Sequence, residues 1–174
     1  MATFSIHSDG NLQVIPAASS SEHDFDFLTG SWLINNRKLN ERLCNCQDWS
    51  EFGASGTLRK ILQGFGNIDD FVTVFEGKPF EGMSLRIFNP QTKLWAIYWS
   101  DTSRYTLDKP VFGSFDGNIG KFYCTDVFNG KEILVMFQWD KQNLAKPVWS
   151  QAFSTDQGKT WEWNWFMTFT REPN

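Results

Sequence analysis

The side chains with the most reactive chemistry in this sequence are three cysteines and two histidines. Cys44 and Cys46 are separated by one residue, Cys124 lies far along the chain, and the histidines are His7 and His23. Zinc sites typically place about two to four residues between paired cysteines and use a second ligand pair. One intervening residue makes a poor chelate and no second pair follows, so we expect no metal site. An odd cysteine count also argues against a secreted disulfide framework.

Residues 154–161 match the Asp-box pattern S-x-D-x-G-x-T-W of sialidase-like propellers. A propeller needs repeated blades, and this chain of 174 residues holds one copy. We therefore interpret the segment as a β-hairpin. In that interpretation Asp156 binds turn amides, Gly158 adopts a positive φ, and Trp161 packs beneath the turn.

No catalytic set is evident. His23 is the one histidine inside the expected domain, and a histidine can act as a general base. A histidine in a helical turn more often bonds a neighbouring carboxylate or carbonyl. The sequence holds no Ser-His-Asp set, P-loop or dinucleotide fingerprint, so catalytic residues stay unassigned and no cofactor is expected.

Aromatic side chains are unusually abundant. They make up 17% of the residues, with nine tryptophans and seventeen phenylalanines. Aromatic residues favour strands, and they also line pockets that bind apolar molecules. The sequence therefore favours an apolar binding cavity over a reactive centre.

Charge and hydropathy exclude other partners. The net charge is −4 and the basic residues are scattered, so no nucleic-acid surface is expected. No run approaches the ~18 apolar residues of a membrane span. The first 21 residues lack the basic start and apolar run of a signal peptide, so we expect a cytoplasmic protein.

Strand patterns separated by turn residues must position these side chains. The expected strands are 32–39, 49–62, 71–76, 82–88, 94–100, 111–115, 121–128, 131–139, 148–154 and 160–171. No amphipathic helix lies between them, which excludes a parallel sheet. We predict an all-β fold, a closed antiparallel up-and-down barrel of about ten strands, with a two-sheet sandwich as the alternative.

The start of the chain is expected to lie outside the barrel. Residues 1–21 read as a loose N-terminal arm, and residues 22–174 as the barrel domain. Ser21 is a good N-cap and Gly30 a good helix stop, which predicts a short N-terminal helix between them.

Alternation along the last strand indicates its inner face. Side chains alternate across a strand. Trp161, Trp163, Trp165, Met167 and Phe169 therefore share one face, which we expect to point inward. Strand 94–100 is apolar on both faces, so we expect the arm or a partner subunit to cover its outer face.

The triplet Gly30-Ser31-Trp32, after a short helical turn, resembles the start of the first strand in lipocalins and the wider calycin group. The resemblance implies that Trp32 closes the barrel floor under an arginine of the last strand, here Arg171. We also expect His23, in the preceding turn, at this floor. A guanidinium over an indole is a cation–π contact. Residues 23–32 and 151–161 resemble a bacterial lipocalin-like family of unknown function, which implies the fold but no substrate.

Haem-binding members of the calycin group carry an extended Gly-rich motif around the tryptophan. Here Leu33-Ile34-Asn35-Asn36 follows Trp32 instead, so haem is not expected.

The leading functional hypothesis is binding of a small, largely apolar or aromatic molecule inside the barrel. The predicted cavity residues are Trp95, Trp99, Trp149, Gln151, Trp163, Trp165, Tyr98 and Arg37, with Arg104 and Tyr105 near the rim. Gln151 or Tyr98 would orient the ligand. One alternative is a cofactor-free cyclase or isomerase that holds a reactive substrate folded. Another is a homodimeric structural protein without ligand, with strand 94–100 in the interface.

Overall fold

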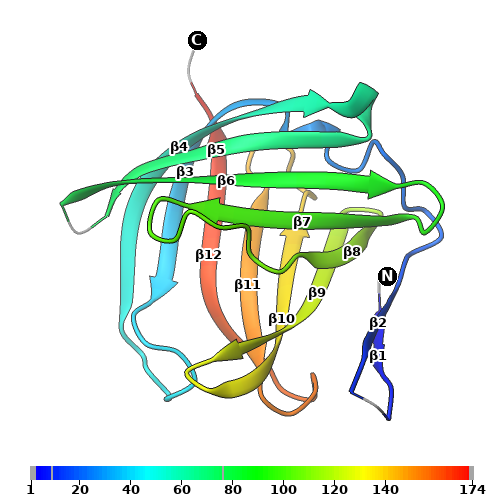
Figure 1. Ribbon diagram of the computed structural model, residues 1–174. Coiled ribbons are helices and arrows are strands. Elements are labelled where there is room, and N and C mark those ends of the chain that lie inside the picture. Colours follow the sequence, from blue (N-terminus) through cyan, green and yellow to red (C-terminus); the bar gives the residue numbers. More distant parts are fainter. Residues whose placement is uncertain (1–2, 9, 76, 173–174) are drawn as a thin grey trace.

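Ten antiparallel strands close into an up-and-down barrel in the computed structural model (Figure 1), which describes residues 3–8, 10–75 and 77–172. Each strand pairs with its neighbour in sequence, and β12 pairs with β3 to close the ring. The strands are β3 (Gly30–Leu39), β4 (Trp49–Ile61), β5 (Gly66–Phe75), β6 (Lys78–Asn89), β7 (Leu94–Asp101), β8 (Val111–Asp116), β9 (Ile119–Phe128), β10 (Lys131–Asp140), β11 (Val148–Ser154) and β12 (Glu162–Arg171). The predicted all-β closed barrel is confirmed, and the sandwich alternative is wrong.

The predicted N-terminal helix is wrong. The described residues contain no α-helix. The segment forms only a 3₁₀ helix of three residues, η1 (Asp26–Leu28). Its carbonyl groups bind side chains of the barrel instead of continuing a helix. Trp32 Nε1 donates to the Leu28 carbonyl at 2.7 Å, and Arg171 donates to the carbonyls of Phe27 and Thr29 at 3.0 and 2.6 Å.

The segment before β3 closes one end of the barrel, which we call the floor and define by Phe25, Leu28, Trp32 and Arg171. Phe25, Leu28 and Trp32 are each at most 2% exposed. The Arg171 guanidinium lies 3.7 Å from the centroid of the Trp32 ring. The chain therefore folds back into its own barrel and fills this end with aromatic side chains.

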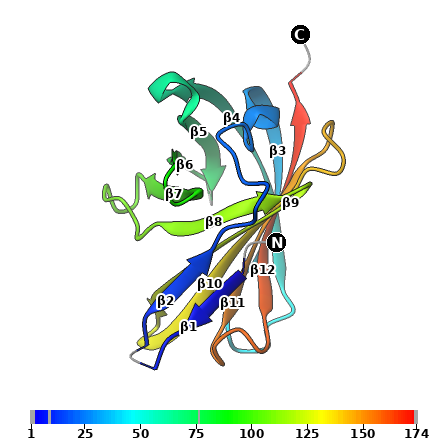
Figure 2. The ribbon, with the colours of Figure 1, turned by 90° about the vertical axis from the view of Figure 1, so that its right-hand side faces the viewer.

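Part of the predicted arm is an ordered hairpin. Strands β1 (Thr3–Ile6) and β2 (Leu12–Ile15) pair antiparallel and lie outside the barrel wall (Figure 2). The Phe4 ring packs 4.8 Å from Tyr123 and 6.4 Å from Trp161. The hairpin thus covers an apolar cluster on the outer face of β9, β10 and β11.

Candidate functional site

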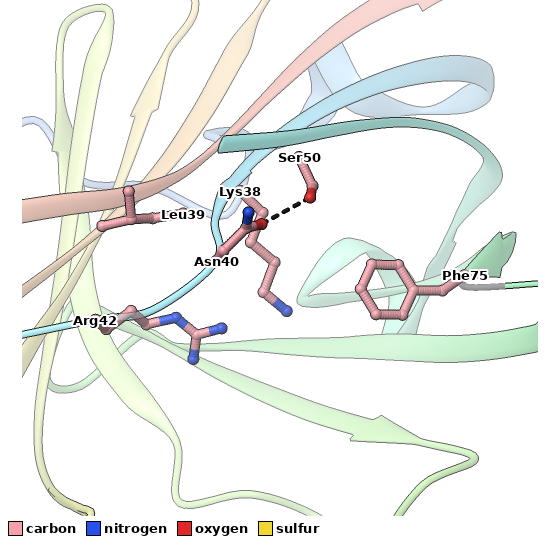
Figure 3. Close-up of a pocket in the computed structure, with 6 residues that line it drawn as sticks. All are labelled: Lys38, Leu39, Asn40, Arg42, Ser50 and Phe75. Carbon is pink, nitrogen blue, oxygen red and sulfur yellow. Dashed lines mark hydrogen bonds between the residues drawn. The ribbon is translucent and has the colours of Figure 1, made fainter. Parts of the chain in front are cut away.

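A half-open pocket of about 400 Å³, whose lining residues are drawn in Figure 3, lies at the end of β3 away from Trp32 and the floor. We call this end the mouth. The pocket is lined by Lys38, Leu39, Asn40, Arg42, Ser50 and Phe75. These residues come from the end of β3, the loop that follows it, the start of β4 and the end of β5. The volume falls within the range of about 300–1,000 Å³ that is usual for small-molecule sites.

Strand alternation carries Lys38 to the inner face. Along β3, Trp32, Ile34 and Asn36 are buried, whereas Leu33 and the other odd positions up to residue 37 are exposed. Lys38 continues the inward series and pairs across the sheet with Ser50 of β4. A lysine that reads as a surface residue in the sequence is therefore part of the cavity wall.

The Lys38 ammonium lies over aromatic rings. Its Nζ atom is 4.2 Å from the Trp165 centroid and 5.8 Å from the Phe75 centroid. Burial, with a further contribution from the nearby positive charge of Arg42, lowers the pKa of Lys38 to about 8, although Asp101 acts in the opposite direction. Among the described residues no carboxylate lies within ion-pair distance of this ammonium.

Arg42 is the second cation of the mouth. Its guanidinium lies 5.6 Å from the centroid of Phe128. Its Nε atom is buried and has no hydrogen-bond partner within the described part of the chain. Burial lowers the pKa of Arg42, and the charge of Glu162 acts in the opposite direction.

Both carboxylates that act on these cations are bound by other groups. The two Glu162 oxygens accept from the Leu43 amide, each at 2.9 Å. Asp101 accepts from Trp99 Nε1 at 2.8 Å and from the side chains of Ser103 and Arg104. These bonds hold the pKa of Asp101 down at about 2, against the effect of its burial. The mouth therefore holds two cations whose nearby anions are already hydrogen-bonded.

Asn36 offers a further polar group below Lys38 on the inner face of β3. It is fully buried, and its Oδ1 atom accepts a hydrogen bond from Trp165 Nε1 at 3.0 Å. Its Nδ2 atom has no partner among the residues that the structure describes. Buried donors are nearly always paired, so this amide is an exception that lies two positions before a pocket-lining residue on the same face of β3.

Five of the predicted cavity residues point into the barrel. Trp149 and Trp165 pack edge to face with centroids 5.6 Å apart. Trp99 packs on Phe71, and Gln151 donates to Asn164 Oδ1 at 2.8 Å. The fifth, Trp95, lies at the floor, where its ring contacts Phe25 at 5.0 Å. Of these five, Trp165 is the one in contact with a residue that lines the mouth pocket.

The placement of Trp163 in the cavity wall is wrong. Gln151 pairs with Trp165 but Ala152 pairs with Trp163, so Asn164 is an extra residue that forms a β-bulge in β12. The bulge reverses the alternation, and Trp163 packs with the outer cluster under the hairpin. The inward ladder therefore starts at Trp165, and Trp161 also lies outside.

Two other predicted cavity residues also lie on the outside. Arg37 is exposed and stacks over Trp49 at 4.4 Å, on the opposite face of β3 from Lys38. Tyr98 lies between Ile97 and Trp99, which both face the core, so its own side chain points outward beside Leu85. Strand parity places both away from any interior ligand. At the predicted rim, Tyr105 is 80% exposed.

His23 lies on the floor segment, but its side chain is exposed. It bonds Asp26 at 3.2 Å and makes no contact with the interior among the described interactions. The three cysteines are free thiols, and the described residues contain no cluster of three or more His, Cys, Asp or Glu side chains able to hold a metal ion. No helix in the described ranges is long and apolar enough to cross a membrane.

The hairpin interpretation of residues 154–161 is confirmed. Asp156 accepts from the Thr160 amide and hydroxyl at 2.9 and 2.6 Å, and these bonds lower its pKa to about 2. Gly158 has a φ of +86°, and Trp161 packs beside Phe4. The motif joins β11 to β12 and takes no part in the mouth pocket.

The sequence reasoning missed Lys38, Arg42 and the free amide of Asn36. Counting in steps of two from Trp32 reaches Asn36 and then Lys38, so the signal for both was present in the alternation. Arg42 lies in a loop, where no periodicity applies. No protein-family model matches this chain, and no curated protein matches it significantly. The closed ten-strand barrel fits a lipocalin-like fold on its architecture alone.

Proposed function

We propose that this barrel binds a small, largely apolar or aromatic molecule at its mouth. The observation that supports this most directly is the half-open pocket of about 400 Å³ beside Lys38 and Phe75. Pockets of this kind are usually largely preformed and combine apolar walls with a few placed polar groups. The rings of Phe75, Trp165 and Phe128 supply apolar surface next to the polar lining residues.

The packing of the floor also favours the mouth as the place where a ligand binds. Phe25 packs edge to face on Trp95 and on Phe115, with centroids 5.0 and 5.1 Å away. Trp139 packs 5.1 Å from Phe169 in the same region. Because these contacts fill the floor, the mouth is the end with space for a ligand.

Binding is tested by fluorescence titration with N-phenyl-1-naphthylamine, a neutral aromatic probe that brightens in apolar surroundings. We expect saturable binding with one site per chain. The substitution Ser50→Phe places a ring in the pocket and should weaken binding at least about ten-fold, because overfilling a site excludes its occupant. The matched control is Glu51→Phe, which adds the same ring to the exposed outer face of β4.

Absence of saturable binding by the wild-type protein would contradict the proposal. Equal weakening by Ser50→Phe and Glu51→Phe would also contradict it, because the probe would then be bound elsewhere on the surface.

A further inference from the structure

The geometry points to an oxyanion on the bound molecule: Lys38 and Arg42 form an anion-recognition pair, and the ligand is a small organic acid with an apolar or aromatic body. This inference rests on the proposed function, since it names the class of molecule that the mouth pocket takes.

The first argument is the contrast between these two cations and the other cations that face the barrel interior or its floor. Arg86 pairs with Asp69 at 2.8 Å and bonds Asn67 at 3.0 Å. Lys141 donates to the Asp24 carbonyl at 3.0 Å. All four cations lie over aromatic rings. Lys38 and Arg42 differ in that no carboxylate of the described residues lies within ion-pair distance of either one, and neither side chain donates a hydrogen bond to a described residue.

Burying a cation without an anion costs free energy. Lys38 and Arg42 also repel each other, because the charge of Arg42 lowers the pKa of Lys38. The two facing carboxylates, Asp101 from β7 and Glu162 from β12, are held by their own hydrogen-bond donors. A ligand oxyanion between the two cations would relieve both the repulsion and the desolvation.

The directions of the side chains fit this role. Figure 3 shows the Lys38 ammonium and the Arg42 guanidinium reaching into the same space, which the Phe75 ring also borders. Lys38 lies near the end of β3, and Arg42 lies in the loop that follows this strand. Arginine and lysine together give an oxyanion charge-assisted hydrogen bonds, which are stronger than neutral ones.

The surrounding groups specify the rest of the molecule. The rings of Phe75, Phe128 and Trp165 lie beside the two cations and offer apolar surface for an attached body. The Asn36 amide, deeper on the inner face of β3, offers a hydrogen-bond donor without a partner among the described residues. An inorganic anion alone would leave this surface unused, so an amphipathic acid fits better.

The test compares two probes that differ by one sulfonate. 8-Anilinonaphthalene-1-sulfonate carries the charge, and N-phenyl-1-naphthylamine has the same rings without it. Loss of a charge-assisted hydrogen bond typically costs a factor of roughly 10 to 100 in affinity. We expect Lys38→Met and Arg42→Met each to weaken the sulfonate by roughly this factor, and the neutral probe by less than about two-fold.

Arg37→Met is the matched control, because it removes the same charge from the neighbouring position on the outer face. It should leave both probes unchanged, and Lys38→Arg should keep most of the affinity for the sulfonate. Near-ultraviolet circular dichroism of each variant establishes that it is folded. Competition extends the test to carboxylates: 4-phenylbutyrate should displace the sulfonate probe more effectively than 4-phenylbutanol.

The pH dependence gives an independent readout. The sulfonate stays ionised throughout, so its affinity should fall as Lys38 loses its proton above pH 8. The neutral probe should show no such fall, and Lys38→Met should abolish the fall for the sulfonate.

The outcomes separate the two proposals. If the neutral probe binds but the sulfonate gains nothing from Lys38 and Arg42, the anion inference is overturned and the binding function stands. If Arg37→Met weakens the sulfonate as much as Lys38→Met does, general surface charge is responsible and the inference fails. If neither probe binds saturably, both proposals fall.

Discussion

Both ends of the barrel place a cation over an indole ring, but the two contacts differ in what else the cation binds. At the floor, Arg171 lies 3.7 Å from the Trp32 centroid and also donates to the carbonyls of Phe27 and Thr29. At the mouth, Lys38 lies 4.2 Å from the Trp165 centroid, with no acceptor among the described residues. The same contact therefore closes one end and leaves binding capacity at the other.

The two indoles also differ in how deeply they are buried and in which group accepts their N–H. Trp32 is 2% exposed and donates its Nε1 proton to the chain segment that fills the floor. Trp165 is only partly buried and donates to Asn36, whose amide donor is unpaired among the residues that the structure describes. The Trp32 indole is therefore bound into the backbone of the segment that fills the floor, whereas the Trp165 indole is bound to a side chain at the end that we propose binds a ligand.

The largest expected effect comes from removing the two indoles in turn. Trp32→Ala should lower the free energy of unfolding by about 3–5 kcal/mol, because it leaves a cavity in a fully packed region. Trp165→Ala should cost less than about 2 kcal/mol, because its ring is only partly buried. Urea denaturation followed by circular dichroism measures both values, and equal losses would contradict the distinction between the two ends.

The next largest effect on the free energy of unfolding comes from replacing Arg171 at the floor and Lys38 at the mouth. Arg171→Met removes a cation–π contact and two hydrogen bonds and should lower the free energy of unfolding by about 1–3 kcal/mol. Lys38→Met removes an unpaired cation and should leave stability at pH 7 unchanged, or raise it by up to about 1 kcal/mol. Denaturant titration of the two variants sharpens the comparison. A loss with Lys38→Met as large as that with Arg171→Met would assign Lys38 a structural role.

The smallest effect is the pH dependence of stability. The pKa of Lys38 is about 8 in the folded chain, below its ordinary value of 10.5. Between these values the unfolded chain binds more protons than the folded chain, so this residue makes stability rise with pH in that window. The unfolding free energy of Lys38→Met minus that of the wild type should therefore decrease between pH 7 and pH 10, by on the order of 1 kcal/mol.

Other titrating groups contribute equally to both proteins, so the difference between their unfolding free energies isolates Lys38. A constant difference across this pH range would show that the mouth does not lower the pKa of the lysine.

Much of the fold followed from local patterns in the sequence. Alternation and turn residues located the strands. The absence of helical segments between strands required antiparallel neighbours, and that excluded most other topologies. The resemblance to lipocalins placed Arg171 of the last strand over Trp32, where the structure has it.

The remaining features depend on long-range contacts that no local pattern encodes. Asn164 has no distinctive sequence signature, yet its bulge moved Trp163 from the predicted wall to the outer surface. The predicted helix gave way because Arg171, distant in sequence, binds the carbonyls of that segment. Lys38 and Arg42 read as solvated charges until the closed barrel brought Trp165, Phe75 and Phe128 beside them.

The bulge at Asn164 bears on how barrels of this kind diverge. One additional residue assigns Trp165 to the interior and Trp163 to the exterior, although the two indoles lie only two positions apart. Deleting a single codon there would restore strict alternation and reassign one of them, because a one-residue slip turns side chains to the opposite face. A lineage could therefore change what its barrel holds by length variation alone, with the strand count and the overall composition kept.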